Sequence, residues 1–367
     1  MREQAQAAIF GIATALPDIC LQAGDYIDFV TGLQNLDEKK HAIVKRMVER
    51  SEIKRRYSVV RDFVTPPEQW TFFDRTNPNF CDTQKRNEFY KKEAPVLAAR
   101  AARELLQQWQ QPVTDITHII VVSCTGVMAP GIEFLLLKEL GLASNVQRLG
   151  INFMGCFGAF RALAVAQALA LQSATNRILI VCVELCSLHI QSDMLLDTII
   201  GNALFGDGAV AFLVGAQPRS VERPLFSIVR CASSMIECSL DAMTWDISNH
   251  GFVMRLSQEI PEFIRRKIHA FAQDLLPPGY EQEDVTWAIH PGGRAIVAAI
   301  EEACGLMRDQ TSSTWHVMAE YGNMSSATIP FVLKHISEQK KQRPWTLGLG
   351  FGPGLSIEGI LLNHVYV

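Results

Sequence analysis

The two halves of this chain repeat one order of elements, and this repeat constrains the fold more than any other feature of the sequence. An Asp-Ile-Thr triplet at Asp115 opens an apolar strand, and Cys156 later introduces a helix of small and apolar residues. An Asp-Val-Thr triplet at Asp284 opens a strand that ends at His290, and a similar helix follows Asn323. The spacings agree, at 41 residues from Asp115 to Cys156 and 39 from Asp284 to Asn323. Two halves rich in β–α–β units predict an α/β fold formed by duplication, with parallel sheets covered by helices.

Hydrophobic periodicity places the main elements along the chain. It predicts helices over residues 38–56, 92–109 and 157–172, and strands over 7–16, 116–122, 178–183 and 345–349. The helix over 157–172 is apolar nearly all round, which is typical of a helix buried on every side. The stretch 217–224 holds two prolines and alternating charges, so we expect a linker there. We therefore predict an N-terminal half (1–220) that carries the cysteine and a C-terminal half (221–367) that carries the histidine and the asparagine.

Composition narrows the class of function. A chain of 367 residues that is 48% hydrophobic can bury a large core, and its net charge of −4 argues against a general role in binding nucleic acid. No apolar run reaches the ~18–20 residues of a membrane span, and the first apolar stretch is broken by Gly11, which favours a buried strand over a signal peptide. The nine cysteines form no CxxC pair and have apolar neighbours. This usage predicts reduced thiols in a cytoplasmic protein that binds no metal and no membrane.

Three residues at matching places of the two halves could form a reaction centre. Cys156 stands at the start of a helix, where the helix dipole and unpaired N–H groups favour the thiolate. His290 ends a strand before the Gly-rich turn that begins at Pro291, and Asn323 follows a glycine at the start of a helix. Each has an ordinary structural alternative, as a buried thiol, a hydrogen-bonded strand-end histidine and a helix N-cap. Together they would supply a nucleophile, a base and an amide donor.

Several motifs give these residues a specific context, and in their order they resemble the type III polyketide synthases of the chalcone synthase-like family. The motifs are Gly155-Cys156-Phe157, Gly201-Asn202-Ala203-Leu204-Phe205-Gly206-Asp207-Gly208, Ala288-Ile289-His290-Pro291-Gly292-Gly293, Tyr321-Gly322-Asn323-Met324-Ser325-Ser326-Ala327 and Gly350-Phe351-Gly352-Pro353-Gly354-Leu355-Ser356-Ile357-Glu358. The similarity runs from about Ile53 to the end of the chain, which is nearly all of it.

The resemblance implies a thiolase fold, with duplicated βαβ halves in a five-layered αβαβα arrangement, and a homodimer. It makes Cys156 the nucleophile that carries the starter acyl group and then the growing chain. His290 would pair with it as a thiolate–imidazolium and, with Asn323, would hold the thioester oxygen. Decarboxylation of malonyl-CoA builds enolate charge on that oxygen, which donors in a dry cavity stabilise well. The resemblance implies acyl-CoA and malonyl-CoA as substrates, no cofactor and no metal, and Phe205 as the gate between the CoA tunnel and the cavity.

For CoA binding, the resemblance implies Arg46, Arg50 and Ala295. A third basic position of the family is here Ile43, which departs from the pattern. Without the resemblance, the basic tract around Arg46 is the solvated face of a helix.

Four cavity positions also depart from those of plant chalcone synthases. Met254 stands for a phenylalanine, Cys124 and His189 stand for threonines, and Trp245 stands for a glycine. A flexible Met254 fits an alkyl chain better than a flat ring, and Trp245 should shorten its side of the cavity. We therefore expect an aliphatic starter with two or three extensions, released mainly as alkylpyrones.

Two other functions fit the same trio. A β-ketoacyl-ACP synthase III would use it for a single condensation, but that family usually follows its histidine with Gln-Ala-Asn, where this chain has Pro291-Gly292-Gly293. A catalytically inactive homologue would bind acyl-CoA without condensing it, and loss of one of the three residues would favour that reading. All three are present.

Overall fold

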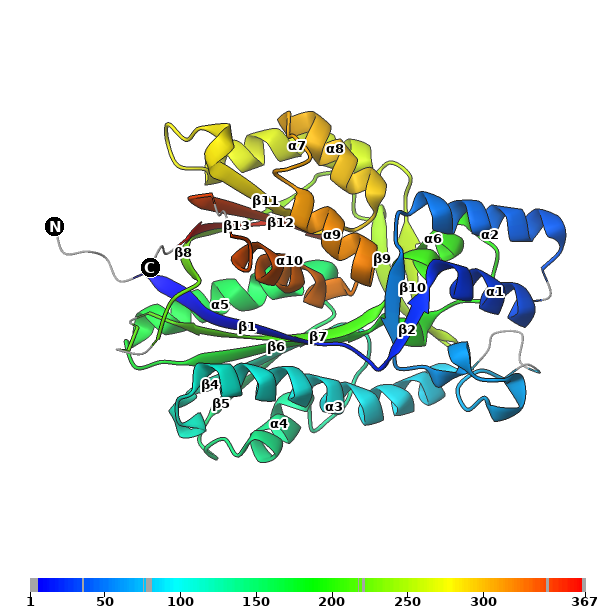
Figure 1. Cartoon of the computed structure of the whole chain (residues 1–367), viewed down its shortest axis with the longest axis horizontal. Helices are drawn as coiled ribbons and strands as arrows, with labels where there is room; N and C mark the ends of the chain where they lie inside the picture. The colour runs from blue at the N-terminus through cyan, green and yellow to red at the C-terminus, as the bar shows by residue number, and fades with distance from the viewer. Residues whose placement is uncertain are drawn as a thin grey trace.

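The computed structural model describes residues 6–34, 36–74, 76, 81–216, 218–219, 222–340 and 343–364. Within these ranges the chain alternates between strands and helices (Figure 1). The strands are β1 (Ala7–Ala15), β2 (Ile19–Gln22), β3 (Arg55–Ser58), β4 (His118–Ser123), β5 (Gln147–Asn152), β6 (Ile178–Leu185), β7 (Asp207–Gly215), β8 (Phe226–Met235), β9 (Met243–Ser248), β10 (Gly251–Leu256), β11 (Val285–Ile289), β12 (Trp345–Gly352) and β13 (Ser356–His364). The α-helices are α1 (Ala23–Gln34), α2 (Glu38–Arg50), α3 (Thr83–Trp109), α4 (Ile132–Leu140), α5 (Gly158–Gln172), α6 (Leu196–Leu204), α7 (Ile260–Leu275), α8 (Arg294–Cys304), α9 (Ser312–Tyr321) and α10 (Thr328–Ser337).

Nine strands form one sheet in the order β11-β12-β13-β8-β1-β7-β6-β4-β5. The two halves of the chain meet where β1 pairs with β8, a short join that runs from Ala7–Ile228 to Ile9–Phe226. The pairs β4–β5, β4–β6 and β11–β12 are parallel, and the remaining pairs are antiparallel. The prediction of parallel sheets is therefore wrong for the sheet as a whole. A short turn after Gly352 joins β12 to β13, and such a turn can join only antiparallel neighbours.

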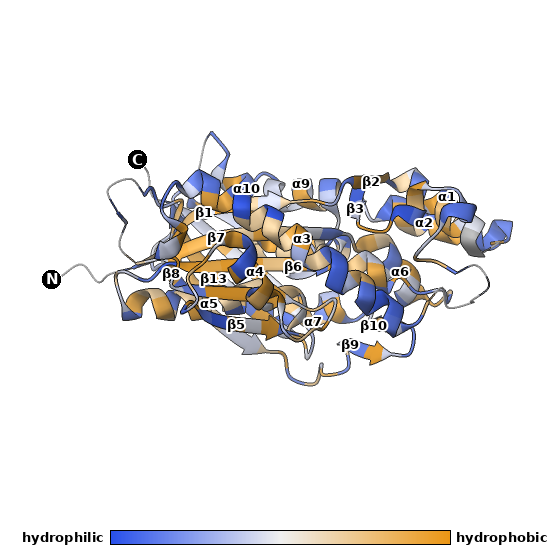
Figure 2. Cartoon of the chain, turned by 90° about the horizontal axis from the view of Figure 1, so that it is seen from below, coloured by the Kyte–Doolittle hydropathy of each residue, from blue (hydrophilic) through white to orange (hydrophobic). Residues whose placement is uncertain are grey.

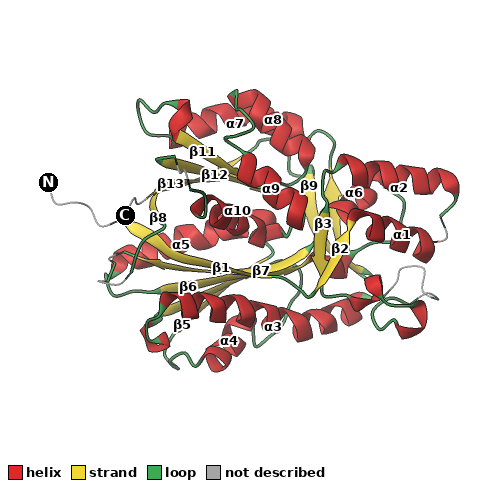
Figure 3. Cartoon of the chain, viewed as in Figure 1, coloured by secondary structure: helices red, strands yellow, loops and turns green. Residues whose placement is uncertain are grey.

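The sheet folds into two portions with helices between and outside them, which gives five layers (Figures 1 and 3). Helices α5 and α10 lie between the two portions, and one cluster of buried side chains, including Phe160 and Val332, joins them to both. A second cluster joins α3 and α4 to the outer face of the first portion, and a third joins α7 and α8 to the outer face of the second. The expected αβαβα arrangement is confirmed.

The burial of successive residues explains why the layers form. In β4, Ile119 and Val121 belong to the outer cluster, whereas Ile120 and Val122 belong to the central one. Both faces of the sheet are therefore apolar, as expected when helices cover both. Figure 2 shows hydrophobic strands such as β6 and β7 among helices that carry hydrophilic residues outward.

The predicted helices are present, but two have different ends. Helix α3 begins at Thr83, because Asp82 caps it by accepting a hydrogen bond from the backbone N–H of Lys85 at 2.8 Å. Helix α2 ends at Arg50 rather than at residue 56, since Glu52 has a left-handed φ of 61° and the chain then enters β3.

The segment Gly155–Gln172 is long and apolar enough to cross a membrane by composition, but 56% of that window is buried inside the fold. Its helix, α5, occupies the central layer, as its apolar pattern predicted. The expected linker at 217–224 lies partly outside the described residues, which omit 217, 220 and 221. The described Glu222 is buried and forms a bidentate ion pair with Arg177.

Candidate active site

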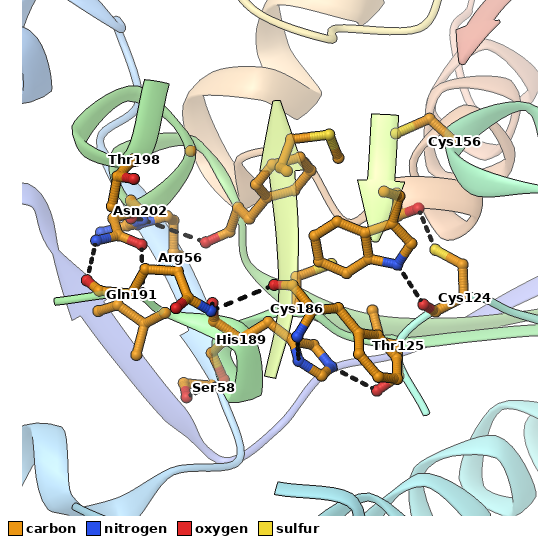
Figure 4. A pocket seen from close by; sticks show the side chains of 18 of the residues that line it. Arg56, Ser58, Cys124, Thr125, Cys156, Cys186, His189, Gln191, Thr198 and Asn202 are labelled. Atoms are coloured by element: carbon orange, nitrogen blue, oxygen red, sulfur yellow. Dashed lines mark hydrogen bonds between the residues drawn. The ribbon is translucent and has the colours of Figure 1, made fainter. Parts of the chain in front are cut away.

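Cys156 lies in the short 3₁₀ turn η4 (Gly155–Phe157), between edge strand β5 and the central helix α5. The preceding Gly155 has a φ of +72°, and a Cβ there would stand 2.7 Å from Cδ of Pro353, which follows β12. Only glycine lets these loops of the two halves approach so closely. The cysteine side chain is buried and lines a cavity (Figure 4).

Asn323 reaches the same place from the second half of the chain. Its Oδ1 accepts hydrogen bonds from the backbone N–H of Ser325 at 2.8 Å and from Oγ1 of Thr328 at 3.3 Å. These bonds orient the amide so that Nδ2 points to Sγ of Cys156, 4.0 Å away. Asn323 is not the N-cap of the helical segments that follow, since Met324 precedes the 3₁₀ turn Ser325–Ala327 and Ala327 precedes α10. Its two amide atoms have different partners, the following residues at Oδ1 and the sulfur at Nδ2.

His290 follows β11 and is almost completely buried. Its backbone N–H donates to the carbonyl of Leu349 on neighbouring β12 at 2.7 Å, but neither ring nitrogen has a hydrogen-bond partner among the described residues. The carboxyl end of β12 packs against η4, since a Cβ at Gly352 would stand 2.3 Å from the ring of Phe157. The two strands thus end facing the cysteine turn, although no described hydrogen bond links the imidazole to Cys156.

Burial dominates the ionisation of the two groups. It raises the pKa of the Cys156 thiol to about 11, while hydrogen bonds from Ser325 and Asn323 act in the opposite direction. Burial also lowers the pKa of His290 to about 3. Both pKa shifts favour the neutral forms, a thiol at Cys156 and an uncharged imidazole at His290. The position of Cys156 at the start of a helix is therefore not enough to produce the thiolate expected from the sequence. Proton transfer from sulfur to imidazole would have to supply it.

A buried acidic side chain, Glu184, joins Cys124 and Thr125 to Ser326 through hydrogen bonds. Glu184 on β6 accepts hydrogen bonds from the backbone N–H of Cys124 at 3.0 Å and from Oγ1 of Thr125 at 2.9 Å, and also from the hydroxyl of Ser326. Burial raises its pKa. Sequence reasoning missed this residue, and the signal was a single charge inside the otherwise apolar strand.

The cavity is walled on one side by an aromatic group. His189 stacks on Phe252 with ring centroids 4.2 Å apart, and Trp245 meets both rings edge-on. The indole N–H of Trp245 donates to the carbonyl of Cys124 at 2.7 Å, which fixes the ring in place. His189 donates from Nε2 to the carbonyl of Thr125 and accepts at Nδ1 from the N–H of Phe252. Its pKa falls to about 3 through burial, so it is a neutral wall residue.

The structure brings the predicted cavity residues together. Cys124, His189, Phe205, Trp245 and Met254 all line the same cavity as Cys156. The other lining residues are of both kinds: Leu21, Phe63, Ile190 and Met243 are apolar, whereas Arg56, Gln191 and Asn202 are polar and lie away from Cys156 (Figure 4). A polar residue, Ser325, also lines the cavity next to Cys156.

The residues expected to bind CoA lie outside this cavity. Arg46 and Arg50 are exposed on α2, and Ala295 is exposed in the first turn of α8. Glu52 connects the two elements, because its carboxylate pairs with Arg294 at 2.6 Å. The third position, Ile43, is also exposed. Among the residues that the structure describes, no group of three His, Cys, Asp or Glu side chains could hold a metal ion.

Comparison with known proteins gives consistent matches along the chain. Residues 1–218 match the family "Chalcone and stilbene synthases, N-terminal domain", and residues 227–366 match the corresponding "C-terminal domain". The chain is 34% identical over 364 residues to "Probable polyketide synthase 1" of Dictyostelium discoideum. That match covers 97% of this chain but only 11% of the length of that relative.

Two solved structures are similar over their full length. The C-terminal type III polyketide synthase domain of Steely1, a type I/III hybrid from Dictyostelium, has a TM-score of 0.93 and 33% identity, covering 98% of this chain and 100% of that one. PKS-I from the brown alga Ectocarpus siliculosus has a TM-score of 0.92 and 29% identity, covering 99% of this chain and 100% of that one.

Proposed function

Because this chain belongs to the chalcone and stilbene synthase family and is similar to a type III polyketide synthase of known structure, we propose that it extends an acyl-CoA starter with malonyl-CoA. The observation that carries the proposal is the amide of Asn323, held 4.0 Å from the sulfur of Cys156, which is buried and lines the cavity. The family match favours this function over a single condensation of the β-ketoacyl-ACP synthase III kind.

Each of the three side chains has a defined part in the proposed reaction. Cys156, after giving its proton to His290, attacks the starter thioester, and CoA leaves with a proton. Malonyl-CoA then loses CO₂, and the enolate oxygen that forms accepts hydrogen bonds from Asn323 and His290. The enolate carbon attacks the acyl group on Cys156, which forms a carbon–carbon bond and releases the sulfur. Return of the longer chain to Cys156 begins the next cycle.

We propose that the starter is aliphatic. Part of the cavity wall is aliphatic, formed by Leu21, Met243 and Met254, and an alkyl chain would pack against it. Trp245 is fixed by its hydrogen bond to Cys124 and closes one side, which limits the number of extensions. We expect two or three extensions with malonyl units and release of the products mainly as alkylpyrones. Alkylresorcinols are the alternative products. Each buried methylene adds up to ~0.8 kcal/mol, so kcat/KM should rise with chain length until the cavity is full.

The CoA part of the substrate would lie across α2 and the start of α8. Arg46 and Arg50 would contact its phosphates, and Ala295 would lie beside it. The proximity of these elements is supported by the ion pair between Glu52 and Arg294.

We also propose a homodimer through the open edge of the sheet. Strand β5 pairs only with β4 among the described strands, and its outer face exposes Leu149. Nearby α4 exposes Phe134 and Leu135, with the Arg148 guanidinium 5.9 Å from the Phe134 ring. An exposed edge strand flanked by apolar side chains is typical of a surface that pairs with another chain. A cytoplasmic location fits the nine free cysteines.

The direct test is mass spectrometry of the products formed from malonyl-CoA and a panel of acyl-CoA starters. Alkanoyl-CoA esters of increasing length are compared with coumaroyl-CoA and benzoyl-CoA. An aromatic starter that outperforms every aliphatic one would contradict the assignment of an aliphatic starter, but it would not contradict the proposed reaction.

A second test concerns the nucleophile. Intact-protein mass spectrometry should show one acyl adduct, on Cys156, that disappears in Cys156→Ala. Cys186 lines the same cavity, so Cys186→Ala is the matched control and should keep the adduct. Acyl loading that survives in Cys156→Ala would refute the proposed chemistry.

A further inference from the structure

The gate residue and the catalytic amide belong to two segments that are joined by backbone hydrogen bonds. The N–H of Asn323 donates to the carbonyl of Leu204 at 2.9 Å, and the N–H of Gly206 donates to the carbonyl of Asn323 at 2.9 Å. Phe205 thereby forms a parallel bridge with Asn323. A shift of the gate segment must therefore move the backbone that carries the amide, although the two lie far apart in the sequence.

One buried arginine on β3 stands behind this bridge. Nη1 of Arg56 donates to the carbonyls of Asn202 at 2.5 Å and of Phe205 at 3.2 Å. Its aliphatic stem fills the space beside both glycines of the bridge. A Cβ at Gly206 would stand 3.4 Å from Cβ of Arg56, and one at Gly322 would stand 3.1 Å from its Cγ. The arginine thus contacts the gate segment through hydrogen bonds and the amide segment through packing.

The guanidinium is only 5% exposed, and burial lowers its pKa. Its central carbon lies 4.0 Å above the ring of Tyr26, and the interaction with Tyr26, followed by the attraction of Asp207, opposes that effect of burial on the pKa. Asp207 is itself held by the N–H groups of Val59 at 2.9 Å and Ser187 at 2.7 Å. Such a buried charge is costly unless its partners are well placed, and a rigid planar donor that reaches two carbonyls is what arginine supplies and lysine does not.

We propose that Arg56 is a positioning residue, which holds the Phe205 gate and the Asn323 amide as one rigid unit. The inference rests on the proposed function and adds a residue to it. Asn323 stabilises the enolate oxygen, so a small displacement of its amide should slow malonyl-CoA decarboxylation strongly, because catalytic groups misplaced by about 1 Å can cost ~10²-fold in rate. Loading of the starter needs the sulfur of Cys156 first and should depend less on Arg56.

The test compares Arg56→Lys with a matched buried arginine. Lysine keeps a positive charge opposite Asp207 but offers only a point-like donor. Arg177 is equally buried and bidentate with Glu222, but it precedes β6 at the end of the sheet opposite Cys156, so Arg177→Lys reports the structural cost alone. We expect Arg56→Lys to lower kcat for malonyl-CoA decarboxylation by about 10- to 100-fold. KM for malonyl-CoA and acyl loading on Cys156 should each stay within about twofold, and Arg177→Lys should change none of the three.

The outcomes separate the two proposals. If Arg56→Lys decarboxylates malonyl-CoA as fast as the unmodified enzyme, or if it loses acyl loading to the same extent, the positioning role is wrong. If Arg56→Lys does not fold, the double variant Arg56→Gln/Asp207→Asn removes both buried charges, which attract each other, and the same selective loss is expected from it. If the unmodified enzyme loads no acyl group on Cys156, the proposed function fails and takes this inference with it.

Discussion

Replacement of Asn323 by alanine removes two interactions that belong to different atoms of one side chain. The lost Nδ2 donor lies 4.0 Å from the sulfur of Cys156, and the lost Oδ1 acceptor holds the N–H of Ser325 at 2.8 Å. Removal of one oxyanion donor typically costs ~10²- to 10³-fold in kcat, or about 2.7–4 kcal/mol. A buried N–H left without a partner costs about 1–3 kcal/mol of stability. We therefore expect a large catalytic loss together with a moderate loss of stability.

Thr328→Val provides the control that separates the two effects. Oγ1 of Thr328 accepts from the N–H of Met324 at 2.8 Å, so the valine variant also leaves a buried N–H without its partner. Valine has a similar volume, but it lacks the hydroxyl. The expected stability loss is again about 1–3 kcal/mol. The amide of Asn323 loses the longer of its two orienting bonds, from Oγ1 of Thr328 at 3.3 Å, but it keeps the bond from the N–H of Ser325 at 2.8 Å and, with it, its donor near Cys156.

The assay is release of labelled CO₂ from carboxyl-labelled malonyl-CoA, run beside urea denaturation of both variants. Asn323→Ala should lose decarboxylation by ~10²-fold or more and Thr328→Val by less than about fivefold, at similar free energies of unfolding. Decarboxylation by Asn323→Ala within threefold of the unmodified rate would refute the donor role. An equal loss in Thr328→Val would show that the effect comes from disturbance of the turn.

Three further predictions concern substrate binding, product length and pH. Charge reversal at Arg46 or Arg50 should raise KM for CoA thioesters more than it lowers kcat in steady-state kinetics, because distant phosphate contacts bind ground and transition states alike; unchanged KM in both variants would make α2 an ordinary solvated helix. Trp245→Gly should lengthen the products by at least one malonyl unit, as read by mass spectrometry, and unchanged lengths would contradict the wall assigned to this ring. Because the pKa values of His189 and His290 are lowered in the folded state, the unfolded state binds more protons than the folded state below pH ~6.5. The free energy of unfolding should therefore fall by about 1.4 kcal/mol for each histidine with every unit by which the pH is lowered. The buried carboxyl groups of Glu184 and Asp207 have raised pKa values and partly offset this fall. Urea denaturation at pH 7.0 and 5.5 tests this, and a His290→Gln variant with an unchanged pH slope would refute it.

Much of the architecture could be predicted from local patterns. The apolar helix after Cys156 does occupy the central layer, and the matched spacings of the two halves do correspond to matched loops. The reason is physical, since a helix that is apolar all round must be covered on all sides. The loops that carry the candidate residues were also indicated by local patterns, because Cys156 does follow a strand, β5, and His290 does follow β11. Asn323 follows helix α9 instead of a strand.

The parts that could not be predicted depend on contacts between distant segments. Arg56 looks like one more basic residue in the tract after α2, and only the fold shows that its guanidinium lies against carbonyls of residues 202 and 205. Glu184 is likewise interpretable only once Cys124 and Ser326 are seen around it. The ionisation of Cys156 went against the helix-dipole argument, because local sequence indicates the dipole but not the depth of burial, which has the larger effect here.

The short join between β1 and β8 has a consequence for how the chain acquires its structure. Strand β1 is made well before its partners β7 and β8, which begin at Asp207 and Phe226, so β1 cannot be paired on either edge until the chain has been made at least as far as Asp207. Contacts so distant in sequence form slowly, and an unpaired apolar strand invites pairing with other molecules in the meantime. The boundary between the halves is therefore a poor place to divide the protein. A fragment that ends near residue 220 would keep β7 beside β1 and leave the other edge of β1 open, so assembly of the two halves from separate chains should be limited by aggregation of the first.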